Sequence, residues 1–445
     1  MRLLLTHAYF LSEDEKEKSI VKPYAPLGIL YLSSHLRSRG FAVEIYDSTF
    51  GSKQELLSYL SEGIPGAIGI YANLMTRRNA VEIARQAREL GWKVILGGPE
   101  PANYPAEYLR VGAHVVVAGE GELALEALLR TNMQPEHWPS INGIFFASPT
   151  GEVVRTAPTT LIRDLDSQPW PDRERIDIHK YLAAWREHHG VGSVSLITAR
   201  GCPYQCNWCS HSVYGKTHRR RSPHPVVDEV EWVLNRYTPE MLWLADDVFT
   251  IHHGWLSQYT AEMRKRGLVT PFECITRADR LNERAVEMLA ELKCFRVWIG
   301  SESGSQRILD SMQRGVTVEQ VRKAVALCKA SGIETGMFLM WGYEGEEIGD
   351  IEATVEHVKA CRPDVYFTTV SYPIKGTPYF DRISDRLVRI DGWEQSTDRD
   401  FQIRGRHSRN FYRHADHLLR SEMSGAPDVA QARAALYSAV HEVEA

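Results

Sequence analysis

The chain has 445 residues, which is too long for one ordinary hydrophobic core and predicts two domains with an extension. Its formal net charge of −5 gives no electrostatic reason to expect a nucleic-acid partner. No apolar run is long enough to cross a bilayer, and the seven cysteines, three of them clustered, fit a reducing compartment, so we expect a cytoplasmic protein.

Short apolar strands alternate with helical patterns over about the first 125 residues, which predicts a parallel, doubly wound sheet. The apolar stretch at 1–6 is too short for a secretory signal and predicts the first strand. Residues 141–163 predict a β-rich connection. The expected strands are 3–6, 42–46, 67–71, 93–96 and 114–118, and the expected helices include 27–39 and 78–90.

Ligands of such sheets bind beyond the carboxyl ends of the strands. Glycine at those ends lets a bulky ligand approach the backbone closely, although each of these turns, taken singly, is more often only a tight turn. The candidate binding residues at the strand ends, and at the turn into the first helix, are His7, Tyr24, Pro26, Leu27, Gly28, Asn73, Leu74, Gly97, Gly98, Pro99, Glu100, Gly119, Glu120, Gly121 and Glu122.

From about residue 193 the alternation resumes with longer helices. Six strand–helix units are too few for a closed eight-stranded barrel and predict a partial one, with its site at the carboxyl ends of the strands. A helix at 416–423 is expected to cap the mouth of this barrel. The expected strands are 195–198, 242–245, 272–276, 296–299, 336–340 and 366–370.

Three cysteines, Cys202, Cys206 and Cys209, stand in one short turn directly after the first strand of the predicted barrel. A closed zinc site or an ordinary iron–sulfur electron carrier uses four ligands, so three thiolates would leave one iron of a cubane cluster open. Two alternatives remain from the triplet alone: a zinc ion completed by a histidine such as His211, or buried thiols without a ligand.

The spacing of these cysteines, within Arg-Gly-Cys-Pro-Tyr-Gln-Cys-Asn-Trp-Cys at 200–209, resembles the signature of the radical S-adenosylmethionine (SAM) enzymes. The resemblance implies a [4Fe-4S] cluster on the three cysteines, whose open iron binds the amino and carboxylate groups of SAM. Electron transfer from the cluster would then release a 5′-deoxyadenosyl radical. Trp208 stands where the family has an aromatic residue near the adenine, and Tyr204 is a further candidate for SAM.

Residues 300–309, Gly-Ser-Glu-Ser-Gly-Ser-Gln-Arg-Ile-Leu, closely match a stretch of cobalamin-linked radical SAM enzymes. The match implies that Glu302 accepts hydrogen bonds from the amine or ribose of SAM and that Ser303 assists. The family's Gly-x-Pro-Gly-Glu after the fifth strand is replaced by Gly-Tyr-Glu-Gly-Glu at 342–346, which indicates an altered substrate wall. Met340 ends that strand and is a further SAM candidate.

Polar residues end the second and third strands as well. Asp246 could bind the SAM amine, although the family's Gly-Gly-Glu is missing there, and Asp247 is equally well a hydrated surface carboxylate. Arg277 could pair with a carboxylate through two parallel hydrogen bonds. The basic run His-Arg-Arg-Arg at 218–221 is expected in a solvated loop for at least two of its arginines, while one could reach SAM or an anionic substrate.

The turn at 22–28, followed by Gly-Gly-Pro at 97–99 and Gly-Glu-Gly-Glu at 119–122, resembles the cobalamin-binding domain fused before many radical SAM enzymes. Residues 164–173 resemble the proline-bearing linker of those fusions. The resemblance implies that the candidate residues of the first domain bind cobalamin. The Asp-x-His-x-x-Gly stretch that gives cobalt a histidine in some cobalamin proteins is absent, and a Rossmann-like domain without the cofactor remains the alternative.

The expected fold is α/β: a Rossmann-like doubly wound parallel sheet, a (β/α)6 partial TIM barrel and a small helical C-terminal extension. We expect the first domain at 1–140, a linker at 141–190, the barrel at 191–380 and the extension at 381–445.

The resemblance, which covers roughly residues 1–380, implies a cobalamin-dependent radical SAM methyltransferase. The radical would abstract hydrogen from an unreactive carbon, and methylcobalamin, remade from a second SAM, would deliver a methyl group. Alternatives are a cobalamin-linked radical cyclase or rearrangement enzyme resembling the anaerobic porphyrin cyclases, a SAM-only radical enzyme with a vestigial first domain, and a redox or cobalamin sensor. We expect a monomer, a small-molecule substrate such as a natural-product or cofactor intermediate, and an electron donor such as flavodoxin or ferredoxin.

Overall fold

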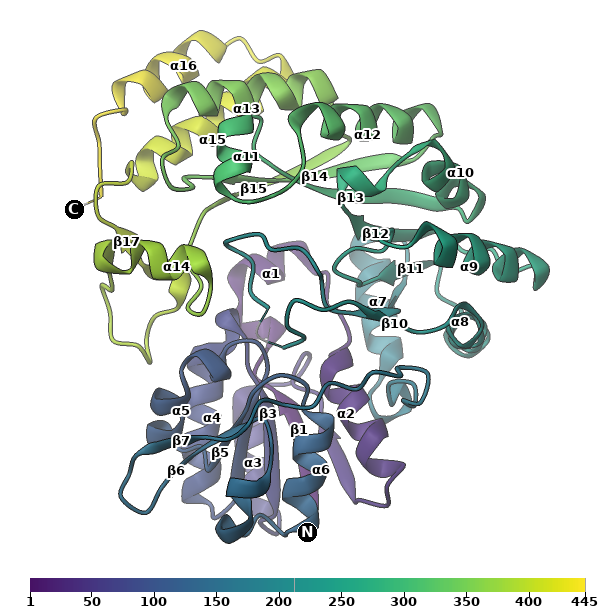
Figure 1. The fold of residues 1–445 in the computed structure, drawn as a ribbon, viewed down its shortest axis with the longest axis vertical. Coiled ribbons are helices and arrows are strands. Elements are labelled where there is room, and N and C mark those ends of the chain that lie inside the picture. The colour runs from purple at the N-terminus through teal and green to yellow at the C-terminus, as the bar shows by residue number, and fades with distance from the viewer. Residues whose placement is uncertain (212, 445) are drawn as a thin grey trace.

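Two α/β units lie one above the other in the computed structural model, which describes residues 1–211 and 213–444 (Figure 1). The lower unit holds a seven-stranded sheet, whose first five strands along the chain run parallel. In spatial order its strands are β2 (Val43–Tyr46), β1 (Leu3–His7), β3 (Ala67–Tyr71), β4 (Lys93–Gly97), β5 (Val115–Val117), β6 (Ile144–Ala147) and β7 (Val153–Arg155).

Both faces of this first sheet are covered by helices, because alternate residues of its apolar strands point to opposite faces. Leu3 and Leu5 pack with the helices of one face and Leu4 with those of the other. The first face carries α2 (Leu27–Arg37) and α6 (Glu122–Arg130), and the second carries α3 (Lys53–Glu62), α4 (Arg77–Glu89) and α5 (Pro105–Val111). The predicted doubly wound sheet is confirmed.

The β-rich connection predicted at 141–163 belongs to the first sheet. Its two strands, β6 and β7, form a hairpin that pairs antiparallel with β5. The sheet is therefore mixed and continues beyond residue 140. The chain then passes through α7 (Ile178–His189) to the second unit.

The second unit is an open sheet of six parallel strands with helices packed on its outer face, as predicted. In spatial order the strands are β15 (Val365–Val370), β14 (Glu334–Trp341), β13 (Cys294–Glu302), β12 (Phe272–Thr276), β11 (Met241–Leu244) and β8 (Ser193–Leu196). The helices are α8 (Pro223–Tyr237), α9 (His253–Lys265), α10 (Glu283–Glu291), α11 (Gln306–Ser311), α12 (Val318–Ala330) and α13 (Ile348–Cys361).

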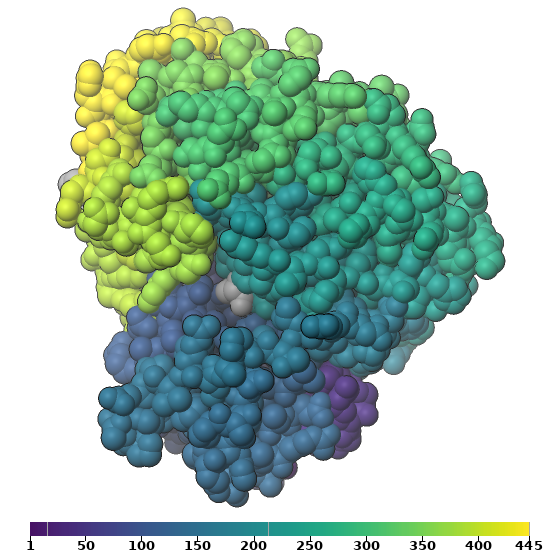
Figure 2. Space-filling model, viewed as in Figure 1, coloured from purple at the N-terminus to yellow at the C-terminus, as the bar shows by residue number. Residues whose placement is uncertain are grey.

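The C-terminal extension does not simply cap the barrel. Its two long helices, α15 (Arg409–Ser424) and α16 (Val429–Ser438), pack beside α13 and the edge strand β15 (Figure 1). The part before them contains α14 (Pro378–Ile383), β16 (Leu387–Val388) and β17 (Gln402–Ile403). This lime-green segment lies between the barrel and the first domain on the face seen in Figure 2. The expected helix at 416–423 is the C-terminal half of α15. None of the described helices is long and apolar enough to span a bilayer.

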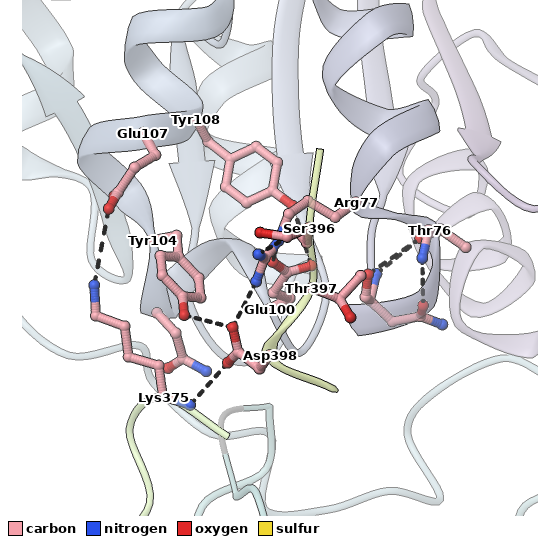
Figure 3. A network of polar contacts seen from close by, with 12 residues as sticks. Thr76, Arg77, Glu100, Tyr104, Glu107, Tyr108, Lys375, Ser396, Thr397 and Asp398 are labelled. Carbon is pink, nitrogen blue, oxygen red and sulfur yellow. Dashed lines mark hydrogen bonds and ion pairs between the residues drawn. The ribbon is translucent and has the colours of Figure 1, made fainter. Parts of the chain in front are cut away.

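A buried ion-pair network ties this extension to the first domain (Figure 3). Arg77, the first residue of α4, donates through Nη2 to Asp398 Oδ1 at 2.8 Å and through Nε to Glu100. Asp398 also accepts hydrogen bonds from the Tyr104 hydroxyl at 2.5 Å and the Lys375 backbone N–H at 3.0 Å. Arg77 and Asp398 are both almost completely buried, and Asp398 Oδ1 also lies 3.7 Å from Arg389 Nη2, so the network joins two arginines to two carboxylates.

We expect Asp398→Asn to loosen the segment that carries it. The substitution leaves a buried cation short of one carboxylate, which costs about 3 kcal/mol, so tryptic cleavage at the nearby Arg389 should accelerate by at least about tenfold. Glu394→Gln is the control, because its pairs with Arg85 and Arg110 are exposed and contribute less than about 1 kcal/mol. Equal cleavage rates for the two variants, measured by mass spectrometry, would contradict this role.

Candidate active site

The three cysteines lie in a loop at the carboxyl end of the second sheet. The loop is bracketed by a two-stranded antiparallel ribbon of β9 (Ala199–Arg200) and β10 (Arg219–Arg220). Cys206 is buried and Cys202 half-buried, while solvent reaches Cys209 although many atoms surround it. Burial and then the neighbouring thiols of Cys206 and Cys202 raise the pKa of Cys209 to about 12. The loop therefore brings the three thiols into one another's electrostatic range.

The donor set of this loop suits an iron–sulfur cluster. Three thiols are offered from one turn, and a cubane is wider than a single ion, so its ligands stand farther apart. Among residues 1–211 and 213–444, no group of three or more His, Cys, Asp or Glu side chains is arranged to hold a single metal ion.

Two buried arginines converge on Cys206. Arg277 Nη1 and Arg314 Nη1 each lie 3.9 Å from its Sγ. The Arg277 guanidinium also lies 3.6 Å above the centre of the Tyr204 ring and donates to Asp279 at 2.8 Å. Arg277 thus pairs with a carboxylate within the protein, and its contact with SAM stays a prediction. Tyr204 faces this arginine.

Arg314 was missed by the sequence analysis because no motif marks it. Its Nη2 donates to the Gly300 carbonyl at 2.8 Å, and its buried Nε has no hydrogen-bond partner among the described residues. Glu302 Oε1 lies 3.8 Å from that Nε, and burial raises the pKa of this carboxyl. An unsatisfied donor and a buried carboxyl side by side form a polar surface next to the cysteine loop that a charged ligand would complete.

Glu302 is held there by an uncommon backbone conformation. It ends β13 at a shift of strand register and has a φ of 63°, in the left-handed region. Such conformations cost energy in a residue other than glycine and cluster at functional sites. The side chain of Ser303 contacts other groups than Glu302 does. Its buried hydroxyl lies 3.2 Å from Thr354 Oγ1 on α13 and accepts from the Ser305 backbone N–H at 3.1 Å. The role expected for Ser303 beside Glu302 stays a prediction, and in this structure its hydroxyl is used within the protein.

The two neighbouring aspartates lie in different environments. Asp246 is buried and saturated, since it accepts from Thr198 N at 2.6 Å, Ala199 N at 3.0 Å and Arg220 Nη2 at 2.5 Å. It therefore fixes the start of the cysteine loop and has no capacity for a ligand amine. Asp247 is exposed and near enough to Cys202 to raise the pKa of that thiol, whose main cause is burial.

An apolar group forms another wall near the loop. Trp208 packs edge-on against Tyr343, with ring centres 6.3 Å apart, in a cluster that includes Met340. Trp208 is half-buried, and Met340 is almost fully buried beneath it. This surface can receive a flat aromatic ring.

A cavity of about 500 Å³ lies between the carboxyl ends of the first sheet and the cysteine loop. The second unit contributes Ile197, Arg200, Val213 and Tyr214 to its lining. Of these four, only Arg200, which stands beside the cysteine motif, could have been predicted from the sequence to lie near a site. From the residues predicted for the first domain, the cavity collects Tyr24, Pro26, Leu27, Gly28, Asn73, Gly97, Gly98, Pro99, Gly119, Glu120, Gly121 and Glu122.

The glycines of this cavity provide room for a large flat ligand. A Cβ on Gly28 would meet no protein atom within 4 Å, and one on Gly97 would meet only Val117, at 3.8 Å. Side chains there would fill the cavity. Gly119 is required for a different reason, because its φ is 82° and a Cβ would meet Thr159 at 2.5 Å.

Three residues predicted for this cavity do not line it. His7 is buried beside Asp47, with 3.0 Å between Nε2 and Oδ1. Glu100 is bound to Arg77 in the network of Figure 3. Leu74 begins the short helix η2 (Leu74–Thr76) and is absent from the lining. A strand end places a residue near the rim, but its side chain can turn towards another partner.

Glu120 and Glu122 line the cavity but are already occupied by ion pairs with the ribbon around the cysteine loop. Arg200 Nη1 donates to Glu120 at 3.0 Å and Arg200 Nη2 lies 2.6 Å from Glu122. Arg219 Nη1 donates to Glu120 at 2.9 Å. All of these side chains are nearly or fully buried. We call these contacts between the two domains the Glu120–Arg200 clasp.

The basic run at 218–221 is not a solvated loop, because each of its arginines has a buried carboxylate partner. Arg219 binds Glu120, Arg220 binds Asp246 and Arg221 binds Glu229. Burial of a guanidinium is tolerated only with such pairing.

Comparison with known proteins gives two matches that fall on the two domains. The family model of the radical SAM superfamily matches residues 196–358, and that of the B12 binding domain matches residues 18–129. An uncharacterised methyltransferase of Pyrococcus horikoshii is 28% identical over 394 residues, which cover 86% of this chain and 83% of that protein. The anaerobic magnesium-protoporphyrin IX monomethyl ester cyclase of Rubrivivax gelatinosus is 25% identical over 405 residues, or 88% of this chain and 71% of the cyclase.

The same fold is found in a solved structure of TsrM, a radical S-adenosylmethionine methyltransferase of Kitasatospora setae with cobalamin and a [4Fe-4S] cluster bound. It superposes with a TM-score of 0.72 at 20% identity, covering 86% of this chain and 74% of that one.

We expect Glu120→Gln to destabilise the joint between the domains. Among residues 1–211 and 213–444, it removes the only carboxylate paired with Arg219 and one of two paired with Arg200, which costs about 3 kcal/mol in the free energy of unfolding. Glu291→Gln is the matched control, because its pair with Arg264 is exposed and contributes less than about 1 kcal/mol. Urea unfolding monitored by tryptophan fluorescence measures both, and a loss for Glu120→Gln no larger than the control's would refute the clasp.

Proposed function

This chain belongs to the B12-binding radical SAM enzymes, and we propose that within this family it is a methyltransferase, which cleaves SAM reductively and transfers a methyl group to an unactivated carbon of a small molecule. The observation that carries the proposal is the shared wall between the two sites. Arg200 stands two residues before Cys202 and also lines the cavity of the first domain. Two cofactors held at these places would act on one substrate without diffusing.

The residues present fit the three cofactors of the family. Cys202, Cys206 and Cys209 would hold the [4Fe-4S] cluster, and the surface of Glu302 and Arg314 would contact SAM. The glycine-lined cavity of the first domain would hold cobalamin. When bound, these groups supply the one-electron and methyl-transfer chemistry, while the protein supplies orientation and exclusion of water.

No described residue that lines the cavity is a histidine. The nearest candidate by sequence, His7, is turned towards Asp47 and Thr49. We propose that this chain places no imidazole on cobalt.

A cyclase is the second candidate, because one of the relatives is named for that activity and resembles 88% of this chain. The mass of the product separates the two functions. A methyltransferase adds one CH₂ group to its substrate, whereas oxidative ring closure adds none.

Anaerobic reconstitution with iron, sulfide, cobalamin and SAM, followed by reduction, tests the proposal. Wild-type protein should form 5′-deoxyadenosine, and mass spectrometry of small-molecule extracts incubated with it should show a species heavier by one CH₂. Cys206→Ala should lose iron and deoxyadenosine but keep its bound cobalamin, because the cavity does not include Cys206. Cys361→Ala is the control, since that cysteine is buried far along the chain on α13. Cleavage of SAM by Cys206→Ala would overturn the cluster assignment.

A separate prediction concerns Arg314. Positive charge and N–H donors beside a cluster sulfur favour the reduced cluster, so Arg314→Gln should lower its midpoint potential. The measurement is a redox titration followed by electron paramagnetic resonance without SAM, at matched iron content. Arg280→Gln is the control, because Arg280 Nε donates to the Tyr204 hydroxyl at 2.5 Å and belongs to the same polar shell without an observed sulfur contact. An unchanged potential in Arg314→Gln would contradict the prediction.

A further inference from the structure

A second cavity, of about 470 Å³, lies beside the carboxyl ends of β14 and β15. Trp341 and Val370, the last residues of these strands, form one side of it. The opposite side comes from the extension, including the first turns of α15. Substrate sites of parallel barrels form at this end of the strands.

The lining of this cavity is strongly cationic in a chain whose net charge is negative. Four arginines line it, Arg399, Arg406, Arg409 and Arg413, against a single acidic residue, Asp416. Asp416 is already committed, because it accepts from the Thr368 hydroxyl at 2.5 Å and pairs with Arg420 at 2.7 Å.

Three of these arginines lack a carboxylate partner. Arg406 is neutralised by Glu444, with 2.9 Å between Nη2 and Oε1. Among the described residues, Arg399, Arg409 and Arg413 form no ion pair; Arg413 donates instead to the Asn410 side chain at 2.9 Å. All three side chains are exposed, so water screens part of their mutual repulsion, and a bound anion would reduce the remainder.

Two further features favour an anion. The cavity includes residues of the first turns of α15, a helix of 16 residues that begins after its N-cap Ser408, and the N-terminus of a helix carries partial positive charge. Trp341, 1% exposed, contributes an indole N–H that has no hydrogen-bond partner within the described part of the chain. Both are hydrogen-bond donors, and they lie in a lining that also carries four guanidinium groups.

The cavity also lies next to the first domain. Arg399 Nη1 contacts the Met75 sulfur of η2 at 3.1 Å, and Asn73, two residues earlier, lines the cavity of the first domain. Arg399 also lies over the Tyr372 ring, 5.4 Å from its centre. A molecule bound here by one end would have its other end beside the place where the two domains meet.

We infer that this arginine cavity binds an anionic group, a carboxylate or a phosphate, of the substrate whose carbon is methylated. That the bound molecule is methylated rests on the proposed function. That the cavity binds an anion does not. Guanidinium groups bind both anions through paired, charge-assisted hydrogen bonds. The neutral part of the substrate would extend from the cavity towards Glu302 and the cysteine loop.

The double variant Arg409→Gln/Arg413→Gln removes two positive charges from the cavity lining. The control is the double variant Arg284→Gln/Arg404→Gln, which removes the same charge from exposed arginines outside the lining. Pyrophosphate and citrate are titrated calorimetrically into the cofactor-loaded proteins. The first pair should weaken binding by at least about tenfold, and the control pair should bind as the wild type does. Failure of wild type to bind either probe, or equal weakening in both pairs, would overturn the inference.

The substrate itself gives an independent result. Cell extract is separated on an anion-exchange resin, and each fraction is incubated with the reduced enzyme and SAM. The species that gains one CH₂ should come from the retained, anionic fraction; its recovery from the unretained fraction would refute the inference. Cobalamin content should be equal in all variants, which shows that they fold, and the control pair should form as much deoxyadenosine without added extract as the wild type does. Absence of deoxyadenosine in the wild type would refute the proposed function and leave anion binding to be judged by calorimetry.

Discussion

The Glu120–Arg200 clasp is the contact on which the arrangement of the two domains depends. Its carboxylates lie in the turn after β5 and at the start of α6, and its arginines stand on the ribbon that brackets the cysteine loop. Buried charges separated from their partners cost several kcal/mol, so the domains cannot slide without breaking these pairs. Because Arg200 also lines the first cavity, the clasp sets the distance between that cavity and the cysteines. Proximity of two reactive sites is thereby built into the ground state of the fold.

Further ion pairs extend this constraint into the loop. Asp246 holds the residues that lead into it, and Arg277 lies on the ring of Tyr204. Arg277 and Arg314 both approach Cys206, and each also donates to a backbone carbonyl that fixes its position. The cations offset the negative charge that three thiolates and a cluster bring together. Glu302, in its strained conformation, is the nearby carboxyl that remains without a saturated set of partners.

Periodicity and strand-end chemistry were enough to predict both sheets and to gather most residues of the first cavity, because these are local properties of the chain. Pairing between distant residues was not predictable. Asp246, Ser303 and His7 stand at the expected strand ends, yet partners on other elements use their polar atoms. The arginines at 219–221 likewise have no local sign of the carboxylates that bury them. Arg314 carried no motif, and only the fold brings it to Cys206.

The residues of the proposed chemistry and the arginines of the second cavity lie in different parts of the chain. The matched family regions, 18–129 and 196–358, contain the clasp, the cysteine loop and Glu302, the groups to which the proposed function assigns the chemistry. Three of the four arginines of the second cavity belong to the segment after β17, and the fourth, Arg399, lies just before it; all are outside those regions. That segment is anchored to the first domain through Asp398 and to the barrel through α15, so its arginines are held in place from both sides. A rigid cationic rim on a shared catalytic core can therefore select the substrate while the reaction stays the same.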